Sequence, residues 1–202
     1  MSRNVHIDDK VVRGIEILNI IVRHLIWKTS KQVRLSPIQI HFILFLRKKP
    51  EKFRKITFLS SEFHLTPATV SNAINSLIKK GIIARKNDPY DRRVYYLYLT
   101  ERGRKIANTL AQWNKSLKAV VSRLNYEDKR SFFKFFLRLI QSLFKDGAID
   151  QVRICPLCGH LVKLAPKKAG NKIFKCLLTG KYMTLEKVEL DCSFYIPHSI
   201  KK

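Results

Sequence analysis

The sequence predicts a mainly α-helical fold with one small β-hairpin, followed by a small β-rich module at the C-terminus. Apolar residues recur every three or four positions through most of the first 145 residues, a spacing typical of amphipathic helices. Two short segments, 82–86 and 94–99, interrupt this pattern and have the residue types of paired strands. All four cysteines lie beyond residue 150, where apolar residues are sparse. We therefore expect two domains, 1–148 and 149–202.

Charge is the strongest feature of the composition. The 202 residues include 40 Lys and Arg against 15 Asp and Glu, a formal net charge of +25. Such an excess predicts a polyanionic partner, most simply double-stranded DNA. A membrane surface is the alternative, but no apolar run approaches the roughly 20 residues that a span needs. The N-terminus carries no apolar signal segment, so we expect a cytoplasmic protein whose cysteines are reduced unless a metal holds them.

A first long helix is expected over residues 8–29. Its apolar residues form a heptad-like seam and a second face, and such a helix packs against more than its own domain. A central core helix in a monomer is the alternative. The stretch 36–39, Ser-Pro-Ile-Gln, then predicts a capped helix start, and Pro50 ends that helix. A short helix over 57–63 and a turn at 64–65 follow.

The stretch 66–81 predicts the second helix of a helix-turn-helix. Thr66 can cap free backbone N–H groups, Pro67 suits the first turn, and Gly81 suits the left-handed end. One face of this helix is apolar, and the other offers hydroxyl and amide groups suited to base edges and phosphates. We expect Ser71, Asn72 and Asn75 to contact base edges. The residues expected to contact the DNA backbone are Thr66, Thr69 and Lys79.

The connection between the two predicted strands, 87–93, is basic and rich in turn-forming residues. Two helices joined by a turn and followed by a basic hairpin make a winged helix-turn-helix. The alternative is a structural helix–hairpin unit with a solvated polar face. The polar helix face and the basic loop occur together, which favours DNA binding.

Two further helices are expected, over 101–124 and 126–145. The second carries two interleaved apolar stripes, one at positions 132, 136, 139 and 143 and one at positions 133, 137, 140 and 144. A chain of this size has little core in which to bury both stripes. We therefore expect a homodimer in which the first and last long helices of two chains interlock. A ligand cavity among the phenylalanines is the alternative.

The order of these elements resembles the MarR (multiple antibiotic resistance regulator) family over about residues 8–146. The most specific match is Asp88-Pro89-Tyr90-Asp91-Arg92-Arg93 followed by Leu99-Thr100-Glu101-Arg102-Gly103, which is similar to the family's wing signature. The stretch Leu77-x-x-x-Gly81-x-x-x-Arg85 is similar to the end of its recognition helix.

This resemblance implies a dimeric, cytoplasmic regulator that binds a pseudo-palindromic operator. Most such regulators are repressors that a ligand, an oxidant or a metal releases. By the same resemblance, Asp91 would position a wing arginine, and Arg92 or Arg93 would enter the minor groove, where a narrow groove focuses negative potential.

No resemblance covers residues 151–202. A Cys-Pro-x-Cys-Gly turn at 155–159 is typical of a zinc knuckle, and four thiolates complete a tetrahedral zinc site. We expect one Zn²⁺ to be bound, and the small module to depend on it for stability. An iron–sulfur cluster or free, redox-active thiols are the alternatives. Short strands are expected at 172–175 and 188–190. The expected ligands, with His160 and His198 in reserve, are Cys155, Cys158, Cys176 and Cys192.

A DNA-binding transcriptional regulator is the function that the sequence predicts best. One alternative is a basic architectural protein that binds DNA without sequence preference. Another is an enzyme whose metal does chemistry, but four thiolates leave no position open for water. The sequence also lacks a Gly-rich phosphate loop, a nucleophile elbow and a His-Glu-x-x-His motif.

Overall fold

The computed structural model describes residues 5–91, 94–149, 152–164 and 174–197. The chain divides into two compact units, Met1–Lys118 and Ala119–Lys202. The domain boundary expected near residue 148 lies inside the second unit, because the last long helix packs with the C-terminal residues. That residues 149–202 form a metal-binding module stays a prediction. None of the helices in the described ranges has the length and apolar character that a membrane span needs.

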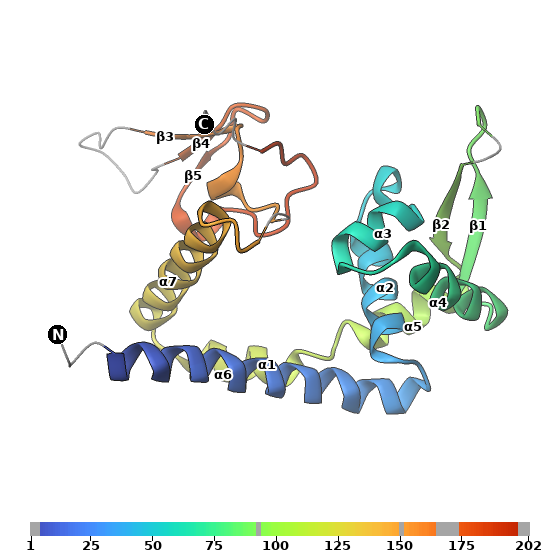
Figure 1. Ribbon diagram of the computed structural model, residues 1–202, viewed down its shortest axis with the longest axis horizontal. Helices are drawn as coiled ribbons and strands as arrows, with labels where there is room; N and C mark the ends of the chain where they lie inside the picture. The colour runs from blue at the N-terminus through green and yellow to red at the C-terminus, as the bar shows by residue number, and fades with distance from the viewer. Residues whose placement is uncertain (1–4, 92–93, 150–151, 165–173, 198–202) are drawn as a thin grey trace. The chain divides into compact units, whose positions relative to one another are not determined.

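The first unit contains five α-helices and a hairpin, drawn in blue to yellow-green in Figure 1. Its elements are α1 (Val5–Val33), α2 (Pro37–Lys48), the 3-10 turn η1 (Glu51–Phe53), α3 (Ile56–Phe63), α4 (Pro67–Lys79), β1 (Ile83–Asn87), β2 (Tyr95–Leu99) and α5 (Glu101–Leu110). Helix α6 (Lys115–Arg123) runs across the division between the units. The helix-turn-helix and wing expected from the sequence are therefore α3, α4 and the β1–β2 hairpin.

Side-chain caps fix where the helices begin. At α2 the Ser36 hydroxyl accepts from the N–H of Gln39 (3.4 Å), and the Gln39 side chain accepts from the N–H of Ser36 (3.1 Å). This is the capping box that the sequence predicts. The Thr66 hydroxyl caps α4 by accepting from the N–H of Thr69 at 3.2 Å. Both caps satisfy N–H groups that would otherwise have no partner at the helix start.

The turn between α3 and α4 is held by a left-handed residue. His64 has φ 50°, and the N–H of Leu65 donates to the carbonyl of Ser60 at 3.0 Å. Histidine tolerates this conformation better than a β-branched residue would. The turn expected at 64–65 is confirmed. It sets α4 across α3, which presents the polar face of α4 outward.

The core of the first unit is built around α2, which contacts α1, α4, α5 and β2. Buried residues from α2, α4 and the wing strands meet there, so one apolar face of each element is removed from water. The largest fully buried side chains of this unit are Ile40, Phe42, Ile43, Leu46, Leu59, Val70, Ile74, Leu77, Ile83, Leu97 and Leu110. The apolar stripe predicted for α4 is thus confirmed as core, and its polar stripe is left for other contacts.

The Leu-Thr-x-x-Gly stretch has a clear structural cause. The Thr100 hydroxyl accepts from the N–H of Gly103 (3.0 Å) and donates to the carbonyl of Gly81 (2.7 Å). A Cβ atom placed on Gly103 would lie 2.1 Å from the carbonyl oxygen of Ile82. Only glycine lets α5 approach the start of β1 this closely. Thr100 and Gly103 therefore join the wing to α5.

The single helix expected over 101–124 is wrong, because the structure breaks it into α5 and α6. Between them the N–H of Trp113 donates to the carbonyl of Leu110 (3.1 Å), a tight turn in place of α-helical bonding. Trp113 packs against the first core, while no described residue of α6 is buried. The chain turns here because the core that holds α5 ends at this point.

The second unit joins α7 (Tyr126–Lys145) to a small β-rich module, as expected. Asn125 caps α7 by accepting from the N–H of Asp128 at 2.8 Å. The module contains the turn η2 (Cys155–Leu157), β3 (Leu161–Lys163), β4 (Phe174–Cys176), β5 (Tyr182–Met183) and the turn η3 (Leu185–Lys187). The three strands form one antiparallel sheet in the order β3-β4-β5.

One apolar stripe of α7 packs against this module. Leu137 is 3% exposed and forms a core with Ile154, Leu157 and Val188, against which the rest of its stripe packs. The other stripe is more open, since Phe132 is 55% exposed. The C-terminal module therefore covers one of the two faces for which the sequence predicts partners.

The strand expected at 188–190 is wrong. Val188 follows the turn η3 and is buried. Glu189 then forms hydrogen bonds with Cys155 and not with a neighbouring strand. The N–H of Glu189 donates to the Sγ of Cys155 (3.2 Å), and its carbonyl accepts from the Cys155 N–H (2.9 Å). The strand expected at 172–175 is observed from Phe174 onward, and residues 172–173 lie outside the described residues.

Candidate nucleic-acid interface and cysteine cluster

The polar face of α4 lies opposite the core. Thr66, Thr69, Asn72 and Lys79 are exposed, whereas Ser71 and Asn75 are half-buried. All six are residues for which the sequence predicts DNA contacts, and they share one helix and its cap. Short hydroxyl and amide groups on an exposed helix face can reach base edges in a major groove. The structure therefore brings these candidates together, while their contacts with DNA stay a prediction.

Two of the polar side chains on α4 have partners on other helices or strands. The guanidinium of Arg85, on β1, donates to the side-chain oxygen of Asn75 at 2.6 Å. Gln39, on α2, donates to the hydroxyl of Ser76 at 3.1 Å. Asn75 is therefore placed as a link between α4 and the wing. The sequence signal for Arg85 was its position eight residues beyond Leu77 in the family-like stretch, but its role was not foreseen.

Arg85 also stacks on the hairpin. Its guanidinium carbon lies 4.6 Å from the ring centroid of Tyr95, the residue opposite Asn87 in the β1–β2 register. A planar cation over an aromatic face is attracted by the ring's negative surface. Arg85 thus contacts both α4 and the second wing strand, which fixes their relative position within the first unit.

Asp88 organises the wing loop. Its carboxylate accepts from the N–H groups of Tyr90 (2.8 Å) and Asp91 (3.3 Å) and from the hydroxyl of Tyr96 (3.1 Å). These bonds, the Tyr90 N–H most strongly, lower the pKa of Asp88, and the charge of Lys55 adds to the effect. The sequence places Asp88 in the wing signature and in a turn, but its role as the acceptor that organises the loop is not predictable from the sequence alone.

The wing residues expected to reach DNA are only partly described. Arg92 and Arg93 lie outside the described residues, so the role expected for Asp91 beside them stays a prediction. The backbone on either side closes a tight loop, since the N–H of Val94 donates to the carbonyl of Asp91 at 2.9 Å. Tyr90 is 96% exposed in this loop. Asp88 therefore anchors the described part of the wing loop.

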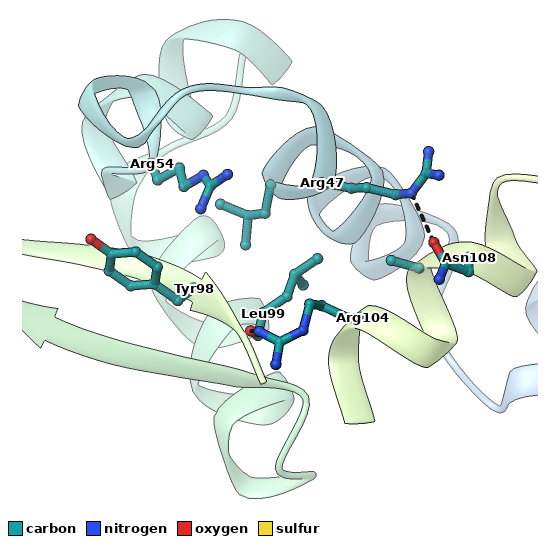
Figure 2. Close-up of a pocket in the computed structure, with 8 residues that line it drawn as sticks. Arg47, Arg54, Tyr98, Leu99, Arg104 and Asn108 are labelled. Carbon is teal, nitrogen blue, oxygen red and sulfur yellow. Dashed lines mark hydrogen bonds between the residues drawn. The ribbon is translucent and has the colours of Figure 1, made fainter. Parts of the chain in front are cut away.

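Three arginines line a cavity of about 260 Å³ behind the wing (Figure 2). Arg47 donates to the Asn108 side chain (3.2 Å), and Arg54 donates to the carbonyl of Lys49 (2.8 Å). Arg104 donates to the carbonyl of Leu99 at 3.1 Å. These hydrogen bonds connect α2, β2 and α5. The three arginines therefore have a structural role.

Tyr98 closes one side of the same cavity. Its hydroxyl donates to a carboxylate oxygen of Glu51. Burial and this hydrogen bond raise the pKa of Tyr98 to about 12. Tyr98 is therefore protonated throughout the physiological range and acts here as a hydrogen-bond donor.

Two other cysteines of the second unit act on the thiol of Cys155. Burial raises the pKa of Cys155, the N–H of Glu189 opposes that effect, and the neighbouring Cys192 and Cys158 raise the pKa further. The N–H of Cys158 donates to the carbonyl of Cys155 (2.9 Å), which forms the tight turn expected of the Cys-Pro-x-Cys stretch. The fold thus brings Cys158 and Cys192 into electrostatic range of Cys155.

Cys176 sits at a similar turn at the end of β4. Burial of its thiol raises the pKa, but hydrogen bonds from Thr179 and from the backbone of Leu178, with the charge of Lys181, outweigh that and lower it. The N–H of Gly180 closes the turn on the carbonyl of Cys176 at 2.8 Å. Backbone N–H groups aimed at a sulfur stabilise a thiolate, the form that binds metals.

The described residues do not assemble a complete metal site. Across residues 5–91, 94–149, 152–164 and 174–197, no group of three or more His, Cys, Asp or Glu side chains is placed to hold a metal ion. All four thiols are free of disulfide bonds. His160 follows Cys158 and Gly159 in the sequence, and His198 lies outside the described residues. That the four cysteines share one metal therefore stays a prediction.

Comparison with known proteins finds similarity to one family over the helix-turn-helix and the first wing strand. Residues 35–94 match the model of the MarR family. Over 81 residues the chain is 31% identical to the uncharacterized HTH-type transcriptional regulator YwhA of Bacillus subtilis (strain 168), an overlap of 40% of this chain and 58% of that protein. The chain thus spans little more than half the length of the curated relatives it matches.

Solved structures share the fold. A MarR family protein from Bacillus stearothermophilus superimposes with a TM-score of 0.60 at 16% identity, covering 70% of this chain and 99% of that one. MepR of S. aureus, in a complex with DNA, gives 0.57 at 20% identity, covering 65% and 97%. The resemblance expected from the sequence is thereby confirmed for its fold. Residues 35–94 thus match the MarR family model in sequence, and about two thirds of the chain shares its fold with these solved structures.

Proposed function

We propose that this protein is a DNA-binding transcriptional regulator. It inserts α4 into a major groove, lays the β1–β2 wing along the neighbouring minor groove, and recognises a pseudo-palindromic operator as a homodimer. The observation that carries the proposal is the joined unit of an exposed polar α4 and a basic hairpin, linked by the Asn75–Arg85 hydrogen bond. The name of YwhA and the DNA complex of MepR support the same function.

The charge distribution supports the choice of partner. A net charge of +25 favours a polyanion, and it makes binding depend steeply on salt, because each phosphate contact releases counterions. Asn72 and Ser71 are the base-edge candidates, and Thr69 and Lys79 lie where phosphates would pass. Asn75 keeps its place on that face, but its hydrogen bond to Arg85 makes it a positioning residue as well.

Dimerisation follows from apolar surface that each unit leaves open. On α1, Ile20 is 57% exposed, and on α7 the stripe that contains Phe132 faces away from the C-terminal module. Large apolar side chains at helical spacing are costly to leave in water. A homodimer through the first and last long helices covers them, and two recognition helices then meet half-sites about 10 base pairs apart. Light scattering of the wild type at micromolar concentration tests this assembly.

The cysteines are proposed to hold one metal ion, Zn²⁺, with an iron–sulfur cluster as the alternative. Two observations support this proposal: Cys158 and Cys192 act electrostatically on the Cys155 thiol, and Cys176 sits in a turn whose N–H groups stabilise a thiolate. Four thiolates are the donor set of a closed structural zinc site. In that role the metal stabilises the module, whereas a cluster would make it responsive to redox state. Repression, and its release by an effector, belong to the same proposal.

The wing arginines and α4 provide the test. A duplex is first selected by the purified protein from a random pool, and its affinity is then measured by fluorescence anisotropy. Asn72→Ala, Arg92→Ala and Arg93→Ala should each weaken binding, the arginine changes by about 1–3 kcal/mol. Thr109→Ala, an exposed change on α5, is the control and should bind as the wild type does. If the control and the variants all bind like the wild type, the proposed interface is wrong.

A further inference from the structure

The second unit contains a cavity that the proposed DNA contacts do not use. Its volume is about 640 Å³, and it lies between α7 and the β-rich module. The volume falls within the range of roughly 300–1,000 Å³ typical of small-molecule sites. Because α7 and the module belong to one compact unit, the lining is defined by contacts within that unit.

One side of this cavity is cationic. Arg130, Lys134 and Arg138 follow one another at intervals of four on α7, so they lie along one side of the helix, and Lys163 faces them from β3. Arg130 forms an ion pair with Glu186 (3.0 Å). In the described part of the chain, no carboxylate pairs with the other three cations.

The floor of the cavity is apolar. Leu137 is buried in the second core, and Leu161, Phe174 and Leu185 pack against that core while they line the cavity. Apolar side chains of a core are costly to leave against water. An ordinary solvated basic surface would have no such floor. The cavity therefore combines an opening that attracts negative charge with a floor that favours an apolar body.

Other polar groups close the site rather than neutralise it. The carboxylate of Glu186 is committed to hydrogen bonds with Thr184 and Arg130. The Gln141 side chain donates to the carbonyl of Pro156 at 3.4 Å, which ties α7 to the Cys-Pro-x-Cys turn beside the cavity. The three cations without a carboxylate partner are thus the groups that face an incoming ligand.

We propose that this cavity binds an amphiphilic organic anion, a single carboxylate or phosphate head carried by an apolar chain or ring. The head contacts Lys134, Arg138 and Lys163, and the apolar body lies on Leu137 and Phe174. A nucleic-acid backbone is a poorer fit, since its charge is repeated along its length and it offers no apolar body for the floor. The inference concerns the second unit alone and holds whether or not the first unit binds DNA.

The test uses the full-length protein and dodecanoate as the probe, measured by isothermal titration calorimetry without DNA. Dodecanoate should bind with one site per chain. Lys134→Gln combined with Arg138→Gln should weaken it about tenfold or more, because two charge-assisted hydrogen bonds to the head are lost. Lys129→Gln combined with Lys145→Gln removes the same charge from α7 outside the cavity and should leave binding unchanged.

Two competitors define the ligand class. Dodecanol, which has the chain without the charge, and inorganic phosphate, which has the charge without the chain, should each displace dodecanoate poorly. If both double variants lost the same dodecanoate affinity, the loss would reflect net charge alone, and the proposal would be overturned. Absence of dodecanoate binding would also overturn the proposal. So would a short oligonucleotide that displaces dodecanoate from the cavity and binds there more tightly than dodecanoate does.

Discussion

The guanidinium of Arg85 on β1 donates a 2.6 Å hydrogen bond to the side-chain oxygen of Asn75 on α4. This contact joins the wing to the helix that we propose to read DNA. Because Arg85 also stacks on Tyr95, one side chain fixes the position of both wing strands relative to α4. A positioning contact of this kind affects every sequence that the protein binds, whereas a base contact affects one position.

A double-mutant cycle tests this role. Asn75→Ala and Arg85→Ala should each lower operator affinity, and the double variant should lose less than the sum, by roughly 0.5–3 kcal/mol of coupling. The measurement is anisotropy on the selected duplex and on single-base variants of it. Additive losses, with the Asn75 effect confined to one base position, would show that Asn75 reads DNA directly and is not coupled to Arg85.

Gly103 predicts a large effect on stability. A Cβ atom there would lie 2.1 Å from the carbonyl oxygen of Ile82, so Gly103→Ala must push α5 away from β1. We expect the free energy of unfolding to fall by about 1–3 kcal/mol, the usual cost of overpacking. Gly14→Ala is the matched control, since nothing lies within 4 Å of its added Cβ on α1. That change should be neutral or stabilising, because alanine favours helices. Similar midpoints for both variants in urea would contradict the close approach.

Glu186 predicts a pH dependence in the second unit. Hydrogen bonds from the Thr184 hydroxyl, from its own backbone N–H and from Arg130 lower the pKa of Glu186 from 4.5 to about 2. A carboxylate with a lowered pKa in the folded state stabilises the fold above its unfolded pKa, and that contribution is lost as the pH falls towards 2. In thermal unfolding, the difference in midpoint between wild type and Glu186→Gln should therefore shrink between pH 4.5 and pH 2. A difference that does not change over this range would show that the carboxylate charge does not matter there.

We expect the four cysteines to hold one metal centre per chain. Protein purified without oxygen should be colourless with one equivalent of zinc, or brown if it holds an iron–sulfur cluster. Cys155→Ser or Cys176→Ser should release the metal and expose residues 151–202 to protease, because so small a module cannot offset its chain entropy alone. Ser193→Ala, next to Cys192, serves as the control. Wild-type protein without metal, and an unchanged protease pattern in the cysteine variants, would exclude both versions.

Local signals in the sequence were reliable where the cause is local. The capping box at Ser36 and Gln39 and the left-handed turn at His64 follow from neighbouring residues, so their positions could be predicted. The break between α5 and α6 could not, because the apolar stripe continues through Trp113 and only the end of the core decides where the helix stops.

The candidate site shows the same division. The polar face of α4 was predictable from the spacing of Ser71, Asn72 and Asn75. The contact between Asn75 and Arg85 was not, since it needs the register of a hairpin against a helix. The two stripes on α7 were visible in the sequence, but only the structure shows that the stripe of Leu137 packs against the C-terminal module.

Competition between the selected duplex and random DNA tests the central claim most directly. A regulator should enrich duplexes that contain two inverted half-sites about 10 base pairs apart, centre to centre. Random DNA of equal length should then compete at least about 10³-fold more weakly at physiological salt. Enrichment without a motif, and equal competition by random DNA, would contradict sequence-specific regulation and indicate an architectural DNA-binding protein instead.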